Sequence, residues 1–360
     1  MAPDMEMDVT HASADCRAHG DGGAPQSAAG VAARPEVSVV ICTYDRPLML
    51  EAAIRSCLAN ATQRALDYEI VVADNSVDGH AAGVVGKFKD ALVPVRSIAA
   101  SPPNISIARN AGIHASRAPL VAFVDDDTMV EPGWLDHLVD AIRSSGADVA
   151  VGRVDAKFTG APSAWDTKGA MFSRNFPAPT GTLIPLAGPK RPRDFAIGTS
   201  NSLWRAETSF TDPEPFDPWF GAAGGEDTDL FLRLARRGRQ VVWCAEAGVW
   251  EIVPDGRTEF SNQLLRVFSS GQGYAAANIK NADNAIARGG SIMMRGAIQA
   301  AGFGLLLAPL GVLKLLGIAN GDTLFKSTAL RASVGLGKAC WWRRLSYYHL
   351  GKSQETKATV

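Results

Sequence analysis

The stretch Val121-Ala-Phe-Val-Asp125-Asp126-Asp127-Thr128 joins an apolar run directly to three consecutive carboxylates. Such a run is typical of a buried strand, and ligands of open α/β sheets bind outside the carboxyl ends of the strands. Because alternate side chains of an extended chain share a face, we expect Asp125 and Asp127 on one side and Asp126 on the other. Neighbouring carboxylates repel each other unless a cation lies between them. The stretch therefore predicts a site for a hard metal ion and a nucleotide.

Strand-like and helix-like patterns alternate on the N-terminal side of this stretch. Residues 37–42 and 68–74 are nearly continuous apolar runs, and residues 48–58 between them carry apolar side chains at helical spacing. A further strand is expected near residues 93–98 and a helix over residues 106–115. This alternation predicts an α/β fold with a doubly wound, mostly parallel sheet flanked by helices.

The first strand-to-helix turn, Thr43-Tyr44-Asp45-Arg46-Pro47, contains no glycine. A dinucleotide-binding fold needs Gly-x-Gly-x-x-Gly at this point, so that the backbone can approach a pyrophosphate. A P-loop NTPase needs a glycine loop that ends in Gly-Lys-Ser/Thr, and the chain has none. Both classes of nucleotide-binding protein are therefore poor fits.

A second informative stretch contains the sequence Gly224-Gly225-Glu226-Asp227, which opens an amphipathic helix that Gly238 is expected to end. Acids are favoured in the first turn of a helix, so capping accounts for one of the carboxylates. Capping does not account for the glycines, which indicate a close approach by another molecule. We expect Asp227 to be catalytic. The residues expected on the substrate side are Trp219, Gly225 and Glu226.

The composition is that of a globular protein with a substantial core, since 46% of the 360 residues are apolar and 20% are charged. A net charge of −1 gives no support for nucleic-acid binding, which needs a basic surface. The five cysteines have no CxxC spacing and the six histidines form no cluster. A zinc site or a disulfide framework is therefore not expected.

The chain is expected to have four parts. Residues 1–34 lack large apolar clusters and predict a disordered tail, and residues 351–360 form a second tail. Residues 35–255 form the α/β domain, and residues 256–350 form a helical, partly hydrophobic region. Within the α/β domain, residues 158–193 are rich in Pro and Gly and are interpreted as a substrate-side loop.

Residues 297–318 are almost wholly apolar, and ~20 apolar residues suffice to cross a bilayer. Pro309 and Lys314 favour a re-entrant or surface-lying hairpin over a single span. Aromatic and cationic residues alternate between Lys338 and Tyr348, as they do in interfacial segments. We expect membrane association, and the alternative is a soluble helical subdomain packed under the sheet.

Five motifs in this order resemble the family 2 glycosyltransferases, which have the GT-A fold. They are Val39-Val-Ile-Cys-Thr-Tyr44, Val71-Val-Ala-Asp74-Asn-Ser, Asn104-Ile-Ser-Ile-Ala-Arg109-Asn110-Ala-Gly112, Phe123-Val-Asp-Asp-Asp127 and Gly224-Gly-Glu-Asp227. The resemblance covers residues 35–273 and is similar to the bacterial succinoglycan-type exopolysaccharide glucosyltransferases. It implies inverting transfer of a sugar from a nucleotide-diphosphate sugar, such as a UDP-sugar, to a glycan or lipid-linked acceptor. It also implies a location at the cytoplasmic face of the bacterial inner membrane.

The resemblance also implies roles for single residues. In the family pattern, Asp127 binds the Mn²⁺ or Mg²⁺ ion that bridges the diphosphate, Asp227 is the general base, and Asn201 meets the donor sugar. The base would be held by Thr43, Tyr44 and Asp74, and the ribose by Asp125. Arg109 and Asn110 match the motif beside the nucleotide.

The sequence departs from the family pattern at two points. Many relatives have a metal-binding His after the last strand, and this chain has Val249-Trp250-Glu251 there. Glu251 is therefore a candidate metal ligand, because a carboxylate suits a hard cation, and a solvated acid at a strand end is the alternative. The processive members carry Gln-x-x-Arg-Trp, whereas Val267 follows Arg266 here, which favours addition of a single sugar.

Two other functions use similar residues. A nucleotidyltransferase also holds phosphates with acids and Mg²⁺, but it would carry a Gly-rich basic loop after the first strand. A non-catalytic sugar-binding protein on the same fold would have no need to retain Asp125, Asp127 and Asp227 together.

Overall fold

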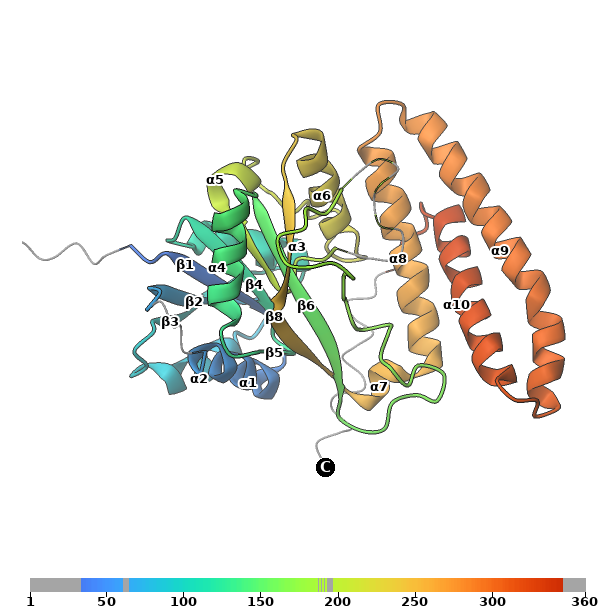
Figure 1. The fold of residues 1–360 in the computed structure, drawn as a ribbon, viewed down its shortest axis with the longest axis horizontal. Coiled ribbons are helices and arrows are strands. Elements are labelled where there is room, and N and C mark those ends of the chain that lie inside the picture. Colours follow the sequence, from blue (N-terminus) through green and yellow to red (C-terminus); the bar gives the residue numbers. More distant parts are fainter. Residues whose placement is uncertain are drawn as a thin grey trace, which may run out of the picture. The chain divides into compact units, whose positions relative to one another are not determined.

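The computed structural model describes residues 34–60, 65–186, 188, 190, 192 and 197–345 (Figure 1). The chain divides into residues 1–33 and residues 34–360, and all that follows concerns the second unit. Apart from Arg34, both of the tails predicted from the sequence lie outside the described residues.

The core of the second unit is an eight-stranded sheet with the order β3-β2-β1-β4-β7-β6-β8-β5. The strands are β1 Val37–Thr43, β2 Tyr68–Asp74, β3 Val95–Ala99, β4 Leu120–Asp125, β5 Thr128–Val130, β6 Val149–Phe158, β7 Ser202–Arg205 and β8 Val241–Val253. Strands β1 to β4 pair in parallel, as does β6 with β8, whereas β7 and β5 pair antiparallel with their neighbours. The α/β fold class is confirmed, with a parallel half joined to a mixed half.

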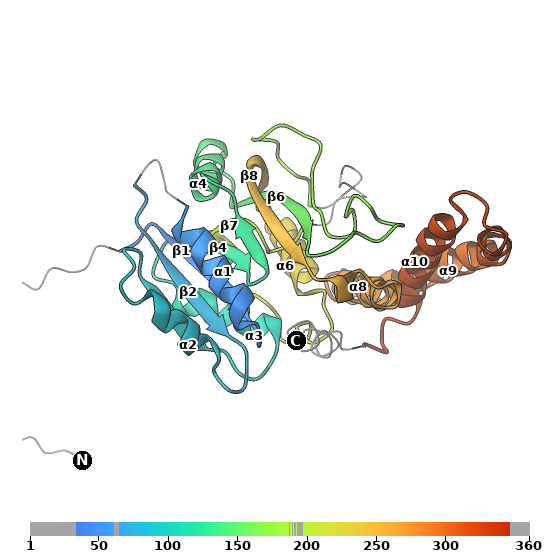
Figure 2. The ribbon, with the colours of Figure 1, turned by 90° about the horizontal axis from the view of Figure 1, so that it is seen from below.

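Helices flank this sheet on both faces and continue beyond it (Figure 2). They are α1 Pro47–Leu58, α2 Ala81–Val85, α3 Ile105–Ala115, α4 Trp134–Ser145, α5 Ala206–Ser209, α6 Glu226–Arg236, α7 Asp255–Thr258, α8 Phe260–Lys280, α9 Ala285–Leu315 and α10 Gly321–Ala339, with a 3₁₀ turn η1 at Gly86–Phe88. The alternating apolar runs of the sequence thus become strands and helices at nearly the expected positions.

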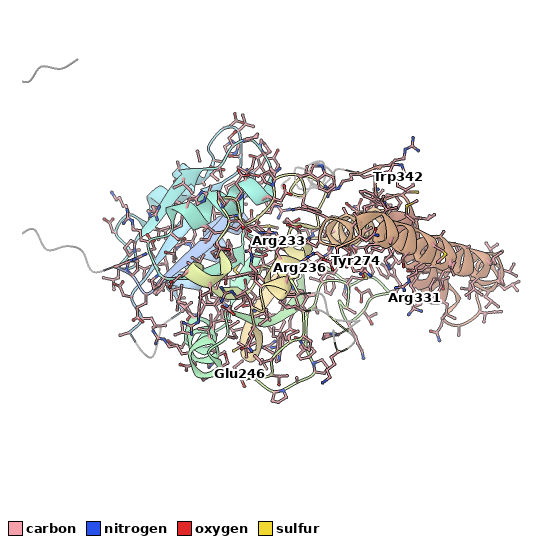
Figure 3. All side chains as sticks on the ribbon, turned by 90° about the horizontal axis from the view of Figure 1, so that it is seen from above. Arg233, Arg236, Glu246, Tyr274, Arg331 and Trp342 are labelled. Atoms are coloured by element: carbon pink, nitrogen blue, oxygen red, sulfur yellow. The ribbon has the colours of Figure 1, made fainter. Side chains whose placement is uncertain are left out.

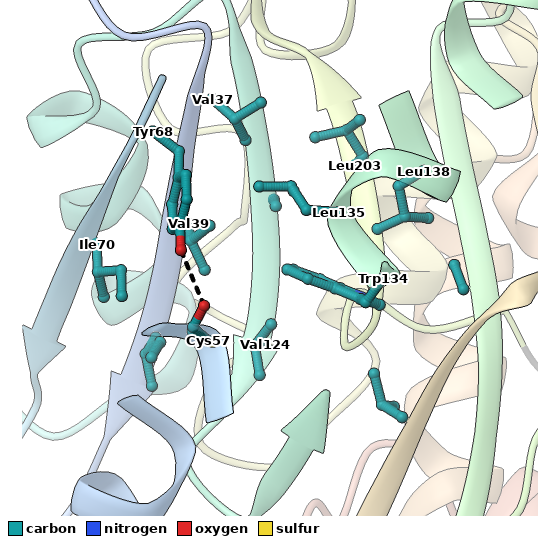
Figure 4. Packing of buried hydrophobic residues seen from close by; sticks show 14 of the residues in the cluster. Val37, Val39, Cys57, Tyr68, Ile70, Val124, Trp134, Leu135, Leu138 and Leu203 are labelled. Atoms are coloured by element: carbon teal, nitrogen blue, oxygen red, sulfur yellow. Dashed lines mark hydrogen bonds between the residues drawn. The ribbon is translucent and has the colours of Figure 1, made fainter. Parts of the chain in front are cut away.

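One face of the sheet packs against α1 and α4 (Figure 4). Trp134, Leu135 and Leu138 of α4 are fully buried there with Val124 of β4. The Tyr68 hydroxyl of β2 donates a hydrogen bond of 2.9 Å to the Cys57 carbonyl oxygen, which satisfies the hydroxyl inside the core. A second cluster around Phe123, Trp204 and Phe216 fills the opposite face. The parallel strands are therefore buried on both faces, as their continuous apolar sequences require.

Beyond the sheet, α8, α10 and α9 lie side by side in that order (Figure 1). Their contacts are made through glycines, because a Cβ on Gly296 of α9 would lie 2.7 Å from the Gly335 carbonyl oxygen of α10. A Cβ on Gly271 of α8 would lie 2.5 Å from the Val334 carbonyl oxygen, also on α10. Helix α10 is thus closely packed on both sides, which fixes α9 to the rest of the unit.

Candidate active site

Three parallel strands end in polar side chains at one edge of the sheet. Thr43 ends β1, Asp74 ends β2 opposite it, and Asp125 ends β4 in register with Cys42. The glycine loop and the start of α6 approach the same edge, since Arg109 of α3 links Asp227 to this group of strands. The acids that are distant along the chain are therefore brought together at the carboxyl ends of the strands.

The three consecutive acids do not alternate as an extended strand would. Strand β4 ends at Asp125, and residues 126–127 form a turn. As a result, the Arg46 guanidinium lies 3.3 Å from a carboxylate oxygen of Asp126 and 3.3 Å from one of Asp127. The prediction that Asp126 lies on the opposite side was wrong because the chain turns one residue after the strand. The Thr43 hydroxyl also donates to Asp126, at 2.8 Å.

Asp127 and Glu251 both accept hydrogen bonds from one side chain, the guanidinium of Arg257 in α7. Arg257 donates to Asp127 at 2.7 Å and to Glu251 at 2.9 Å. Both acids are buried, and strand pairing places Glu251 of β8 opposite Thr128, the residue that follows Asp127. The two predicted metal ligands therefore do converge, although an arginine side chain joins them here.

Arg109 forms ion pairs with two acids at the start of α6, Glu226 and Asp227. Its guanidinium lies 2.8 Å from Glu226 and 2.7 Å from Asp227, and it packs on the ring of Phe216. The Thr199 hydroxyl donates to the same oxygen of Asp227. Asp227 is thereby held in one orientation, and its side chain is 25% exposed, so that a bound molecule can reach it.

Asp125 lies between these two groups and is influenced by both. Burial raises the pKa of Asp125, Arg109 lowers it, and Asp127 raises it again. Burial likewise raises the pKa of Asp126 to about 6, with Arg46 acting in the opposite direction. No hydrogen bond from any described residue reaches the Asp125 carboxylate. This carboxylate is therefore available to a ligand.

Several residues expected at the site also have contacts within the chain. The Asp74 carboxylate accepts hydrogen bonds from Ser76 and from the Ala81 amide, which fixes the start of α2. The side-chain amide of Asn110 bonds in both directions to the backbone of Phe216, at 2.7 and 2.9 Å. Tyr44 remains half-buried in the first turn. Asp74 and Asn110 thus shape the edge on which the other residues lie.

Asn201, expected beside the donor sugar, is fully buried. Its amide oxygen accepts from the Trp134 indole at 2.7 Å, and its amide nitrogen donates to the carbonyl oxygens of Arg153 and Ala247 at 2.7 and 2.8 Å. The residue has a φ of 58°, a left-handed conformation that Asn tolerates better than most residues. Because every polar group of this side chain is used inside the protein, we leave Asn201 out of the proposed site.

The glycines before the acids serve a contact within the chain. Gly225 has a φ of 104°, and a Cβ there would lie 2.8 Å from the Cα of Gly273 in α8. At Gly225, helix α8 therefore makes the kind of close approach that the sequence indicated. Trp219 of the same loop is 54% exposed, and the guanidinium of Arg344 lies 4.2 Å from the centre of its ring. Arg344 also donates to the carbonyl oxygens of Trp219 and Gly224, which fastens the loop to the end of the helical region.

Three residues that hold the acids in place were not predicted from the sequence: Arg46, Thr199 and Arg257. Arg46 lies in the first turn and Arg257 follows the last strand, both at positions where any polar residue would fit a loop. Phe172, from the loop that was expected on the substrate side, packs beneath Arg257 and Arg266 at 5.6 and 4.8 Å. The signal available in the sequence was the excess of acids at strand ends, which require cations nearby.

Comparisons with known proteins agree with this arrangement. Residues 38–199 match the family model described as glycosyl transferase family 2. The succinoglycan biosynthesis protein ExoM of Rhizobium meliloti (strain 1021) is 29% identical over 237 residues, which are 66% of this chain and 73% of the relative. The poly(ribitol-phosphate) beta-N-acetylglucosaminyltransferase TarP of Staphylococcus aureus (strain N315) is 30% identical over 138 residues, 37% of this chain and 42% of the relative.

Among solved structures, S. aureus TarS 1–349 in complex with UDP has a TM-score of 0.46 and 15% identity. The match covers 82% of this chain and 89% of that chain, but it is too distant to carry an inference about function. The sequence matches support a glycosyltransferase, and the sheet with acids at its edge agrees with them. Over residues 38–199 the chain is thus similar to glycosyltransferase family 2.

Proposed function

We propose that this protein is an inverting, metal-dependent glycosyltransferase of bacterial surface or exopolysaccharide synthesis. It moves a sugar from a nucleotide-diphosphate sugar, taken here as a UDP-sugar, to a hydroxyl of a glycan or lipid-linked acceptor. The observation that carries this proposal is the position of Asp125 at the end of β4, with Asp127 and Glu251 converging on Arg257 and Asp227 held by Arg109. The name of the ExoM relative, a succinoglycan biosynthesis protein, supports the class of product.

In the proposed reaction, Asp227 accepts the proton of the acceptor hydroxyl as the new glycosidic bond forms. Arg109 and Thr199 hold its carboxylate, and its partial exposure leaves room for an acceptor. Asp125 binds the ribose, and Thr43 and Tyr44 lie at the end of β1 beside the nucleotide base. Proton transfer to a positioned carboxylate contributes roughly 10²–10⁴ in rate. The half-exposed Trp219 ring offers an apolar face to the acceptor sugar.

The donor atoms present fit a hard divalent cation. Asp127 and Glu251 supply carboxylate oxygens that already converge on one positive group. The described residues contain no cluster of three or more His, Cys, Asp or Glu that would hold a metal alone. Mg²⁺ and Mn²⁺ sites of nucleotide enzymes often use one or two carboxylates, with phosphate oxygens and water completing the shell. A cation bound there would stabilise the charge on the departing diphosphate.

The test separates binding from transfer. Asp227→Asn is expected to retain binding of the nucleotide sugar within about twofold and to lose at least about a hundredfold in transfer, since only the proton acceptor is removed. Binding is measured by calorimetry with UDP-sugars and Mn²⁺, and transfer by release of diphosphate nucleotide. Asp217→Asn, which alters an acid of the same loop that pairs with Lys280, is the control. Equal losses of binding and transfer in Asp227→Asn would refute the role of general base.

We also place this enzyme at the cytoplasmic face of the inner membrane. Helix α9 is the one helix of the described residues long and apolar enough to cross a bilayer, and only 6% of its apolar window is buried. A lipid-linked acceptor gives a physical reason for membrane association, because enzyme and substrate then share a surface.

A further inference from the structure

Helix α9 carries an exposed apolar stripe on its outer side, from Met294 to the residue that caps its C-terminal end, Leu316. Met294, Ile298, Leu305, Val312 and Leu316 are between 55% and 79% exposed. They recur at intervals of four, seven, seven and four residues, a spacing that keeps side chains on one helix face. From residue 297 to residue 313 the helix contains no charged residue. An apolar surface of this length is not expected to face water in a soluble monomer.

The opposite side of α9 is closed by α10. Gly296 of α9 and Gly335 of α10 bring the two backbones together, and Gln299 of α9 donates to the Arg331 carbonyl oxygen. In the helical period Gly296 lies on the other side from the apolar stripe. The stripe is thus the outer edge of the three-helix layer, with α10 and then α8 behind it (Figure 2).

The charges around this edge favour an anionic surface. Residues 285–345 contain eight Lys or Arg residues and a single acid, Asp322, whereas the whole chain has a net charge of −1. Of the eight, Arg344 contacts the glycine loop, and Lys314 and Lys326 pair with Asp322. The guanidinium of Arg331 lies 5.6 Å from the centre of the Phe303 ring on α9. Figure 3 labels Arg331 and Trp342 beside the C-terminal helices. Two copies that met through this edge would bring two cationic regions together. An anionic lipid leaflet is the partner that complements both the apolar stripe and the cations.

A transmembrane orientation would bury charges. Helix α10 runs beside α9 and carries Asp322, Lys326, Arg331 and Lys338 along its length. If α9 crossed the bilayer, α10 would be drawn into the hydrocarbon with it, and each central charge there is costly. An orientation parallel to the surface leaves these charges at or above the headgroups.

We propose that α9 lies in the plane of the membrane, with its outer stripe from Met294 to Leu316 inserted at the boundary between headgroups and acyl chains of an anionic leaflet. The inference rests on the membrane association proposed above and adds its geometry and its lipid class. The three-helix layer stands on edge over the lipid and carries the catalytic sheet on its far side. This makes the protein a surface-bound enzyme and not an integral one.

The first experiment measures flotation of the full chain with vesicles of pure phosphatidylcholine and of phosphatidylcholine with phosphatidylglycerol. We expect at least about tenfold stronger binding to the anionic vesicles, and at least about a tenfold loss in Leu305→Glu. Leu92→Glu is the matched control, because Leu92 is a fully exposed leucine of the α/β domain. If the wild type binds no vesicles but forms a dimer that Leu305→Glu dissociates, the edge is a contact between copies and the proposal is overturned.

The second experiment distinguishes an in-plane helix from a spanning one. Asp283→Cys and Ile318→Cys place thiols just outside the two ends of α9, in a background with Cys16 and Cys340 replaced by Ser. Both thiols are expected to react with a membrane-impermeant maleimide added outside sealed vesicles. Protection of one thiol until detergent is added would overturn the in-plane orientation. Transfer to a soluble acceptor by Leu305→Glu reports separately on the proposed enzymatic function, since Leu305 is remote from the catalytic acids.

Discussion

At the scale of single residues, Arg257 decides how strongly the site attracts a cation. It occupies the point where Asp127 and Glu251 converge, so a metal ion must displace its guanidinium from both acids. We expect Arg257→Gln to bind Mn²⁺ at least about tenfold more tightly in the absence of nucleotide, because two charge-assisted hydrogen bonds no longer compete. Calorimetric titration with Mn²⁺ alone measures this effect.

A matched control is Arg143→Gln, which removes an arginine that pairs with a single exposed acid, Glu36, away from the site. Its affinity for Mn²⁺ is expected to equal that of the wild type. If Arg257→Gln also leaves the affinity unchanged, Arg257 and the metal do not compete, and the ion does not bind between these two acids.

Glu226 gives the site a pH-dependent effect on stability. Burial raises the pKa of Glu226, Asp227 raises it further, and Arg109 lowers it. Since the folded pKa exceeds the unfolded one, the neutral acid contributes stability at pH values below about 4.3, the unfolded value, and this contribution is lost as the pH rises through the folded pKa. The free energy of unfolding of Glu226→Gln should therefore fall less than that of the wild type between pH 4 and the raised pKa. Denaturant unfolding at several pH values measures it, and parallel curves for the two proteins would contradict the assignment.

The residue scale also shows what could be predicted from the sequence. Asp125, Asp127 and Asp227 were found because carboxylates at strand ends and at a helix start carry a local signal. Arg257 was missed because its importance comes from a contact with Asp127, 130 residues away in the chain. The buried position of Asn201 was not foreseen, because its role was taken from a resemblance, whereas its hydrogen bonds to Trp134 and to two strands are long-range.

At the scale of elements, the strands of the parallel half follow directly from their apolar runs, whereas the packing of α6 on α8 does not. Gly225 and Gly273 bring the glycine loop against α8. We expect Gly225→Ala to lower the free energy of unfolding by at least about 3 kcal/mol, from the left-handed backbone and from the clash with Gly273. Gly224→Ala is the matched control, because Gly224 also has a positive φ but a Cβ added there would meet no atom within 4 Å. It should cost about 1–2 kcal/mol.

Denaturant unfolding of the two variants isolates the contact between the loop and α8, since the backbone strain is common to both. Equal losses would show that Gly273 can move away and that the approach of α8 is not fixed. The sequence analysis assigned these glycines to a bound molecule. A glycine is needed wherever another group comes close to the backbone, and the sequence does not show whether that group is a ligand or another part of the same chain.

At the scale of the whole unit, the order α9, α10, α8 and then the glycine loop would set the height of Asp227 above the lipid in the proposed membrane-bound orientation. Packed helices have axes ~8–10 Å apart, so α8 lies roughly 15–20 Å from α9 where α10 separates them, and Asp227 lies beyond α8. At their connected ends the two helices touch, since Ile279 of α8 lies beside Gly289 of α9. With α9 in the lipid surface, a carrier bearing one sugar cannot bring that sugar to Asp227 without leaving the bilayer. We therefore expect lipid-linked acceptors with several sugars to be used at least about tenfold faster than a lipid-linked monosaccharide in anionic vesicles.

The same acceptors in detergent micelles provide the control, because a micelle does not hold the acceptor and α9 in one plane. There the dependence on acceptor length should weaken, and soluble glycans with the same terminal sugar should show little dependence on length. Rates of nucleotide release across the series measure both cases. The lipid-linked monosaccharide could instead be used equally fast in vesicles. In that case either the catalytic edge lies much closer to the lipid, or α9 is not the surface in contact with the lipid. Labelling of Ile318→Cys at the end of α9 decides between these two explanations.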